Sequence, residues 1–210
     1  NMEWGAVTYL SHSKYGINKE VAINSTRTFT TGCGPQSASS TTNGTTCNSY
    51  TTTLGQSAST TGNVYGIYDM SGGAREYMMG NMVWSNGQSM IGYQPNNYNS
   101  AFTGILYAGT SFTGTYAFPS KRYYDKYSYG ESYTEYTRGK LGDAIKEMAP
   151  TGTSGNWYGD YAIFVYSADS WVDRGGFSGS GTDAGAFALS MNYGHAYTDS
   201  STRAVISNLN

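Results

Sequence analysis

The stretch of residues 62–77 reads GNVYGIYDMSGGAREY and bears most directly on the fold. It interleaves glycines with aromatic residues and two acids. Glycine allows backbone conformations and close approaches that side chains block, whereas large side chains fill the space between neighbouring turns. The stretch therefore predicts tight turns whose large residues, Tyr68, Met70 and Tyr77, are anchored in a core.

The composition around this stretch indicates one folded, loop-rich domain over residues 1–210. Only 12% of the residues are charged, whereas the chain holds 28 glycines and 21 tyrosines. This balance excludes a helical bundle, and the many aromatic residues argue against a disordered linker. A net charge of −2 with scattered basic residues gives no basic patch that would bind nucleic acid. No apolar run is long enough to span a membrane, so we expect membrane contact only through segments outside this chain.

The N-terminal part predicts one helix, one strand and a polar insertion. Apolar residues at helical spacing in residues 2–15 place Trp4, Val7 and Leu10, and also Ala6, on one side of a first helix. Alternation over residues 21–29 predicts a short strand. Residues 34–61 are nearly all small and polar, and such a segment buries little. We therefore expect an exposed insertion at about residues 30–61.

The remaining chain predicts several short strands and few helices. We expect irregular structure over residues 81–136 and a short helix over residues 139–148, with Leu141, Ala144, Ile145 and Met148 on one face. Alternation predicts strands at residues 162–166, 184–191 and 203–206, with a turn at Arg174-Gly175-Gly176. This pattern indicates the α+β class.

The two cysteines, Cys33 and Cys47, lie in the polar insertion. Their spacing and the secreted character of the composition favour a disulfide that closes a surface loop. Two free thiols and a metal pair are the alternatives. A metal pair has little support, because the two histidines, His12 and His195, are distant in sequence.

Four motifs occur in an order that is similar to one known superfamily. They are Glu3-Trp4, the turns at residues 66–77, Arg174-Gly175-Gly176 and Arg203-Ala204-Val205. The chain thereby resembles the formylglycine-generating-enzyme (sulfatase-modifying-factor) superfamily, a compact variant of the C-type lectin fold. The resemblance spans nearly the whole chain. It implies a C-type-lectin-like fold with short strands, two or so helices and long irregular loops.

Charged residues of these motifs are expected to tie the central turns to the C-terminal strands. Arg174 and Arg203 are the candidates for pairing with Asp69 or Glu76, because buried turns of this kind need satisfied charges. The motif glycines are expected in conformations that other residues rarely adopt.

Two departures from the superfamily pattern bear on function. The enzymes of the superfamily bind copper through a cysteine pair near the C-terminal end, and residues 177–210 contain no cysteine. Gly73 and Tyr77 stand where the superfamily commonly has Asn and Trp, which weakens the case for its calcium site. Asp69, Glu76 and Asn63 still leave oxygen ligands for a calcium ion. We expect no catalytic residues and no other cofactor.

A closer resemblance within the superfamily is to the variable proteins of diversity-generating retroelements. In those proteins a lectin-like scaffold displays a C-terminal segment that is mutated at adenines. Residues 164–206 resemble that segment in the order of their residues and in the alternation of scaffold residues with residues that adenine-rich codons yield when mutated. Scaffold positions implied by the resemblance are Arg174, Gly175, Gly176, Gly185, Phe187, Ala188, Gly194 and Arg203. Ligand-contacting positions, called the predicted contact positions below, are Ser167, Asp169, Trp171, Asp173, Phe177, Ser180, Asp183, Ser190, Asn192, Tyr193, His195, Tyr197 and Asp199.

The resulting hypothesis is a non-enzymatic receptor-binding or adhesion domain on a cell or virion surface, bacterial or phage. Tyrosine and tryptophan supply contact area, and serine and asparagine adapt their hydrogen bonds, so such a segment suits a protein or glycan ligand. A structural head domain of a pilin-like or virion surface assembly is the alternative. An oxidase of the formylglycine-generating type has less support, because His12 and His195 are isolated and no catalytic constellation stands out.

Overall fold

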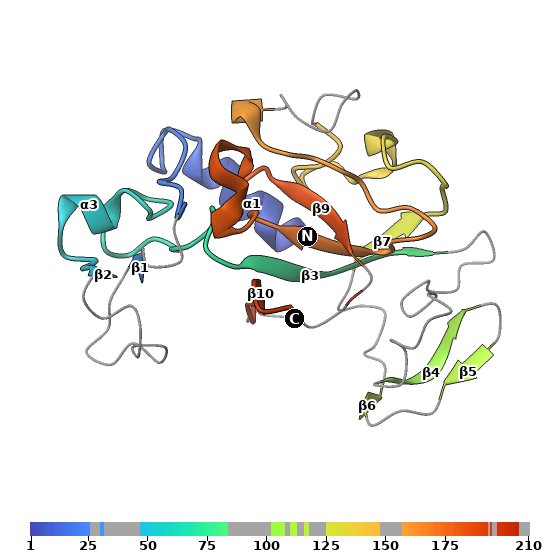
Figure 1. Ribbon diagram of the computed structural model, residues 1–210. Helices are drawn as coiled ribbons and strands as arrows, with labels where there is room; N and C mark the ends of the chain where they lie inside the picture. The colour runs from blue at the N-terminus through green and yellow to red at the C-terminus, as the bar shows by residue number, and fades with distance from the viewer. Residues whose placement is uncertain are drawn as a thin grey trace, which may run out of the picture.

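The computed structural model describes residues 1–25, 30–31, 47–83, 102–107, 110–112, 116–117, 125–147, 157–192, 194 and 197–205. It is an α+β structure in which one curled sheet carries few helices (Figure 1). This confirms the predicted class. Within these residues, none of the helices has the length and apolar character needed to span a bilayer.

The main sheet has the strand order β10-β3-β8-β9. Its strands are β3 (Arg75–Val83), β8 (Trp171–Arg174), β9 (Leu189–Asn192) and β10 (Ser200–Thr202). Strand β8 pairs antiparallel with both β3 and β9. On the other edge of β3, β10 runs parallel to its first residues and β7 (Asp125–Ser128) parallel to its last. The long strand β3 therefore joins the middle of the chain to its C-terminal strands.

The other elements are short. Figure 1 shows the 3-stranded sheet β5-β4-β6 apart from the main sheet, and α3 on another side of it. The bounds are β1 (Thr30–Thr31), β2 (Cys47–Asn48), α3 (Thr53–Gln56), β4 (Phe102–Tyr107), β5 (Thr110–Phe112) and β6 (Tyr116–Ala117), with 3-10 turns η2 (Tyr136–Arg138), η3 (Trp157–Gly159) and η4 (Ser178–Asp183).

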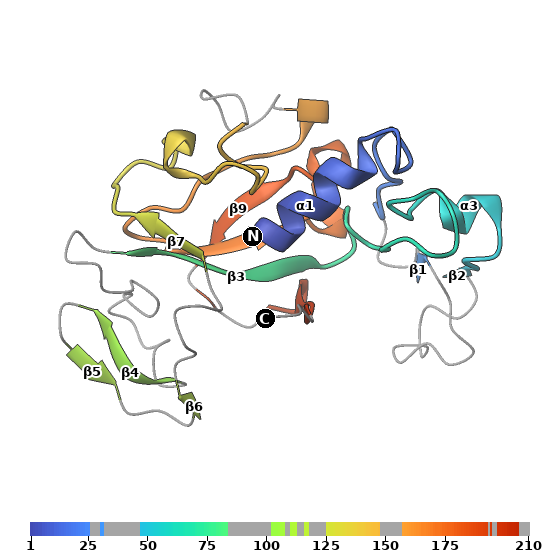
Figure 2. The same cartoon turned by 180° about the vertical axis from the view of Figure 1, so that it is seen from behind.

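Helix α1 (Met2–Ser11) packs along one face of the sheet (Figure 2). Its buried residues are Trp4, Gly5, Thr8 and Ser11, whereas Leu10 is 44% exposed. The Trp4 indole N–H donates to the Ala186 carbonyl at 2.7 Å. A helix was thus correctly predicted, but it is shorter than expected and Leu10 was wrongly placed on its buried side. Small residues line that side because the backbone at residues 142–143 approaches Gly5 closely.

The glycine turns behave as predicted. Gly72, Gly73, Gly175 and Gly176 all have positive φ, between 69° and 84°. The Gly72 N–H donates to the Gly175 carbonyl at 2.8 Å, so the two turns bond directly to each other. Met70 is buried at 2% exposure, as expected. Tyr68 and Tyr77 were wrongly placed in the core, because both are only partly buried and Tyr77 lies opposite Asp173, on the other face of the sheet from the core. Because a Cβ at Gly72 would lie 2.3 Å from the Asn24 carbonyl oxygen, glycine is required there.

Arg203 pairs as predicted and Arg174 does not. The Arg203 guanidinium contacts both carboxylate oxygens of Glu76 and donates to the Tyr68 carbonyl at 2.9 Å. Arg174 is fully buried and lies opposite Glu76 in the register of β3 and β8, but its guanidinium reaches other partners. It donates to the carbonyls of Asp143 and Ala144 at 3.0 and 3.3 Å, and its guanidinium lies 5.8 Å from the Trp4 ring centroid.

The helix predicted over residues 139–148 is wrong for the described part, which is a turn. Gly142 and Ala144 have φ of 94° and 55°, which no right-handed helix contains. The Asp143 carboxylate accepts the N–H groups of Lys140 and Ile145 at 2.7 and 2.8 Å and so satisfies the backbone locally. Ala144 and Ile145 are buried as predicted, whereas Leu141 is 78% exposed.

Two further expectations need correction, and a third falls on side chains that are not described. The polar insertion is not exposed throughout, because Ala58, Ser59 and Thr60 are buried and the Thr60 carbonyl accepts the Ile17 N–H. Val21 is buried, but residues 21–25 form only an isolated bridge at Asn24. Cys33 and the side chain of Cys47 lie outside the described residues, so the disulfide stays a prediction.

The predicted C-terminal strands are displaced or shorter. Residues 162–165 are buried but form only an isolated bridge at Ala162, because their N–H groups reach different partners, such as the Tyr133 carbonyl for Phe164. The strand expected at 184–191 is confined to β9. The one expected at 203–206 occurs instead at β10, since Arg203 leaves the strand to reach Glu76.

Replacing Arg174 by methionine tests whether this buried cation supports the fold. Arg174→Met leaves the buried Asp143 without its cationic neighbour and the two carbonyls without their donor. We expect the free energy of unfolding to fall by about 3–5 kcal/mol, measured by urea unfolding with tryptophan fluorescence. The exposed Lys19→Met is the control and should cost less than about 0.5 kcal/mol. Equal stability of both variants would contradict the assignment.

Candidate functional site

Alternation along the strands divides the main sheet into two faces. In β8, Val172 and Arg174 point into the core, so Trp171 and Asp173 point to the opposite face. Their partners in β9 are Asn192 and Ser190. This second face is called the pocket face. Its residues in β3, β8 and β9 are Arg75, Tyr77, Trp171, Asp173, Ser190 and Asn192.

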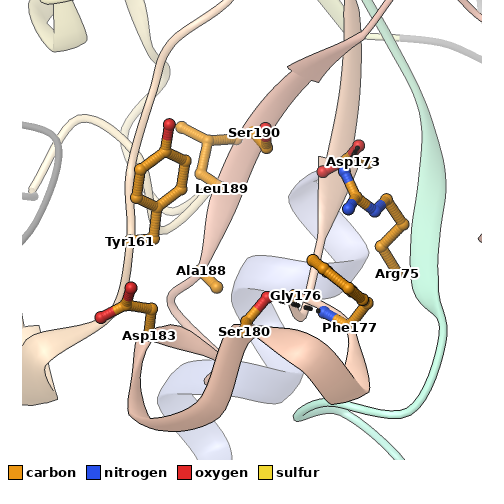
Figure 3. A pocket seen from close by; sticks show the side chains of 10 residues that line it. All are labelled: Arg75, Tyr161, Asp173, Gly176, Phe177, Ser180, Asp183, Ala188, Leu189 and Ser190. Carbon is orange, nitrogen blue, oxygen red and sulfur yellow. Dashed lines mark hydrogen bonds and ion pairs between the residues drawn. The ribbon is translucent and has the colours of Figure 1, made fainter. Parts of the chain in front are cut away.

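A small open pocket lies on the pocket face (Figure 3). Tyr161 and Asp183 form one wall, and Arg75, Asp173 and Phe177 form the other. The cavity volume is about 80 Å³. This is well below the roughly 300 Å³ of a small-molecule site, so it holds a terminal group rather than a whole ligand. The remaining lining residues are Gly176, Ser180, Ala188, Leu189 and Ser190.

Arg75 organises the charges at the pocket. Its guanidinium lies 3.6 Å from an Asp173 carboxylate oxygen and 3.3 Å from one of Asp199. It also lies over the Phe177 ring, 4.6 Å from the centroid. The Asn192 amide donates to Asp173 at 3.2 Å. The positive charge of Arg75 is thus shared between two carboxylates and one aromatic ring.

Burial raises the pKa of the Asp173 carboxyl to about 6, although Arg75 and Asn192 act in the opposite direction. Asp173 is therefore mostly ionised at neutral pH. Burial, then the carboxylates of Asp173 and Asp183, raise the pKa of the Tyr161 hydroxyl. Tyr161 consequently stays a neutral phenol in this acidic setting.

Close backbone approaches hold the loop that surrounds the pocket. A Cβ at Gly176 would lie 2.9 Å from Ala184, and one at Gly185 would lie 2.0 Å from the Asp160 carboxylate. Ser180 accepts the Phe177 N–H at 3.2 Å, and the Ser178 N–H donates to the Gly73 carbonyl at 2.9 Å. The loop is therefore tied to both the glycine turns and the segment before Tyr161.

Asp160 anchors the base of this loop. Its carboxylate accepts the Phe187 N–H at 2.8 Å and shares a hydrogen bond with the Glu20 carboxyl. Burial and the neighbouring Glu20 raise the pKa of Asp160 to about 7, and burial also raises the pKa of Glu20. Two adjacent buried carboxyls favour sharing one proton.

The structure gathers nine of the predicted contact positions around the pocket face. Five line the pocket, namely Asp173, Phe177, Ser180, Asp183 and Ser190. Asn192 and Asp199 contact the pocket's charged residues. The ring centroids of Trp171 and Tyr77 lie 6.2 Å apart. Burial, then Asp173 and Tyr197, raise the pKa of the Tyr77 hydroxyl, which places Tyr197 near Tyr77.

The other predicted positions lie elsewhere. Ser167 and Asp169 belong to the turn before β8, where the backbones of Asp169 and Tyr166 bond to each other. Tyr193 and His195 lie outside the described residues. Exposure also differs among the positions, since Asp183 and Tyr197 are exposed whereas Asp169, Asp173 and Asn192 are less than 9% exposed. The buried three support neighbouring side chains more than they offer surface.

Sequence reasoning missed two pocket residues, Arg75 and Tyr161. Arg75 was treated as part of a turn, although alternation from Arg75 through Tyr77 was present in the sequence and marks a strand with one polar face. Tyr161 directly precedes a buried run, and no local pattern distinguishes it. Its position depends on the Tyr161 N–H donating to the Asp183 carbonyl at 2.9 Å.

Two of the oxygen ligands considered for calcium are engaged with other groups. The Glu76 carboxylate is paired with Arg203, and the Asn63 side chain accepts hydrogen bonds from its own turn. In the described ranges no three or more His, Cys, Asp or Glu residues converge on one point.

Asp160 predicts how stability changes with pH. An acid with a higher pKa in the folded than in the unfolded chain binds more protons when folded, so its contribution falls as pH rises. For Asp160 this window runs from 3.8 to about 7. We expect Asp160→Asn to be more stable than the parent at pH 7, by roughly 3 kcal/mol, with a flatter profile in urea titrations across this window.

Glu147→Gln is a control that should change the stability in the opposite direction. Burial alone would raise the pKa of Glu147, but the hydrogen bond from the Gly142 N–H and the nearby Tyr9 hydroxyl lower it. Glu147 thus adds stability that is lost as pH falls, so its removal should weaken the protein at pH 7. If the free energy of unfolding of the parent rises between pH 4 and 7, and Asp160→Asn does not alter this profile, the raised pKa assigned to Asp160 is contradicted.

No protein-family model matches this chain, and no curated protein or solved structure is significantly similar to it. Its function must therefore be inferred from the residues themselves.

Proposed function

We propose that this chain is a non-enzymatic ligand-binding domain of the receptor-binding or adhesion type. The observation that carries the proposal is the convergence of predicted contact positions from β8, η4, β9 and the segment before β10 on one face of the sheet. Those residues are far apart in sequence, from Asp173 to Asp199. A surface built from several C-terminal segments on a rigid sheet suits recognition of a protein or glycan.

The scaffold under this face is suited to sequence variation above it. Arg174, Phe187 and Ala188 are nearly or fully buried, whereas neighbouring Ser180 and Asp183 are not. Substitution at positions that are not buried, such as Ser180 and Asp183, leaves the core packing untouched. This division supports a variable protein of a diversity-generating retroelement on a C-type-lectin-like, formylglycine-generating-enzyme-like fold, displayed at an extracellular, cell or virion surface of bacterial or phage origin.

A binding role is favoured over catalysis by the state of the charged groups. Arg75 and Asp173 neutralise each other and are held by Asp199, Phe177 and Asn192. Such engaged groups hold shape and charge in place, and they are poorly suited to moving protons. The proposal includes no metal or other cofactor in the binding step.

One observation favours the alternative, a structural head domain in a pilin-like or virion surface assembly. Residues 28–68 contain no charged residue, and Leu54 and Tyr65 there are 57% and 92% exposed. Exposed apolar side chains in a segment without charged residues suit contacts between subunits. Concentration-dependent assembly in sedimentation velocity would favour this alternative, and a monomer at the highest soluble concentration would count against it.

Two libraries of the full chain, displayed on yeast, test the binding proposal. The first randomises Ser180, Asp183, Ser190 and Tyr197, and the second randomises Arg174, Gly176, Phe187 and Ala188. We expect most members of the first library to fold, with melting temperatures within a few degrees of the parent, and to yield binders against unrelated protein targets. Members of the second should mostly be lost, because core and close-contact substitutions cost several kcal/mol. Equal loss of folded members from both libraries would contradict a tolerant binding face.

A further inference from the structure

The pocket on the pocket face differs from its surroundings in charge. Of the described residues that line it, Arg75 is the one cation, whereas Asp173 and Asp183 are both acidic. Asp199 contributes a third carboxylate through its ion pair with Arg75. Three carboxylates against one guanidinium leave a net negative charge. An incoming anion would therefore meet repulsion at the pocket, and an incoming cation would meet attraction.

Arg75 itself is poorly placed to receive an anion. Its guanidinium faces Asp173 and Asp199 and covers the Phe177 ring. An anionic ligand would have to displace a carboxylate that is already bound. Asp173 is held in its position by Asn192 and has only 2% of its side chain exposed, so displacement would disturb the sheet.

The opposite wall offers what a cation needs. Asp183 is exposed at the rim, and the neutral Tyr161 ring lies beside it (Figure 3). An aromatic face and a carboxylate together stabilise an ammonium or guanidinium group. The hydroxyl of Ser190, in the same lining, adds a hydrogen-bond acceptor.

The size of the pocket selects the kind of ligand. A volume of about 80 Å³ leaves room for one small end group, since a site for a whole small molecule has roughly 300 Å³ or more. The end of one lysine or arginine side chain matches such a space, whereas a sugar ring needs more. The stem of the side chain would leave through the open side of the pocket, toward the rest of the partner.

We propose that this pocket receives a single basic side chain, lysine or arginine, of a protein partner. The inference rests on the proposed binding function and narrows it to a protein ligand with a basic residue at the contact. The aromatic cluster of Tyr77, Trp171 and Tyr197 then flanks that residue with apolar contact area.

The test uses the full ¹⁵N-labelled chain and four acetylated, amidated tripeptides, Gly-Arg-Gly, Gly-Lys-Gly, Gly-Glu-Gly and Gly-Gln-Gly, at millimolar concentrations. We expect the arginine and lysine peptides to shift the backbone amides of Gly176, Phe177, Ser180 and Ala188. The glutamate and glutamine peptides should leave them unmoved, and high salt should weaken the shifts.

Variants separate the pocket from general charge attraction. Asp183→Asn should weaken binding of the arginine peptide on the order of threefold to tenfold. Ser190→Lys, which places an ammonium group in the pocket, should abolish it. Glu3→Gln removes the same charge from α1, outside the pocket lining, and should leave the affinity unchanged. Spectra of the free variants verify that each is folded.

Each other outcome overturns the inference in a distinct way. Shifts of the same amides by the glutamate peptide would assign the pocket to an anion bound by Arg75. If only other residues of the pocket face shift, the pocket does not receive the basic side chain, and the proposed binding function still stands. If no peptide moves any amide, the inference fails, and the randomised libraries still decide the binding function by themselves.

Discussion

The buried guanidinium of Arg174 is the constraint on which the sheet depends. Its donation to the carbonyls of Asp143 and Ala144, beneath the Trp4 ring, fixes which side of β8 faces the core. Because side chains alternate along a strand, Asp173 must then face the pocket. A shift of β8 by one residue in its register would exchange these two faces. Arg174 would then leave the core, and Asp173 would leave the pocket.

Much of the scaffold was predictable from local sequence, and the reason is glycine. The turns at Gly72, Gly73, Gly175 and Gly176 were expected to need unusual conformations, and all four have positive φ. The helix at the start and the α+β class also followed from local patterns. The helix expected over residues 139–148 did not form, because Asp143 bonds to nearby N–H groups and turns Ala144 and Ile145 inward. Such local competition between a side chain and the helical hydrogen bonds is not contained in the periodicity of apolar residues.

The candidate site was predictable where its residues share one segment. Positions from Asp173 to Asp199 were identified by residue type, and the sheet brings most of those that are described to one face. Arg75 and Tyr161 were missed because each reaches the pocket through a long-range contact, Arg75 with Asp199 and Tyr161 with Asp183. A binding surface assembled from distant strands is therefore only partly encoded in any one stretch.

The central claim is that the C-terminal segment binds ligands on a scaffold that tolerates its variation. Deep sequencing of this gene across one source population tests the claim most directly, by comparing codons 167–199 with codons 1–160. The account predicts substitutions concentrated at pocket-face positions such as Ser180, Asp183, Ser190 and Tyr197, with Arg174, Gly175 and Gly176 invariant. A segment as invariant as the rest of the gene would contradict diversification and leave a domain of fixed specificity or a structural subunit.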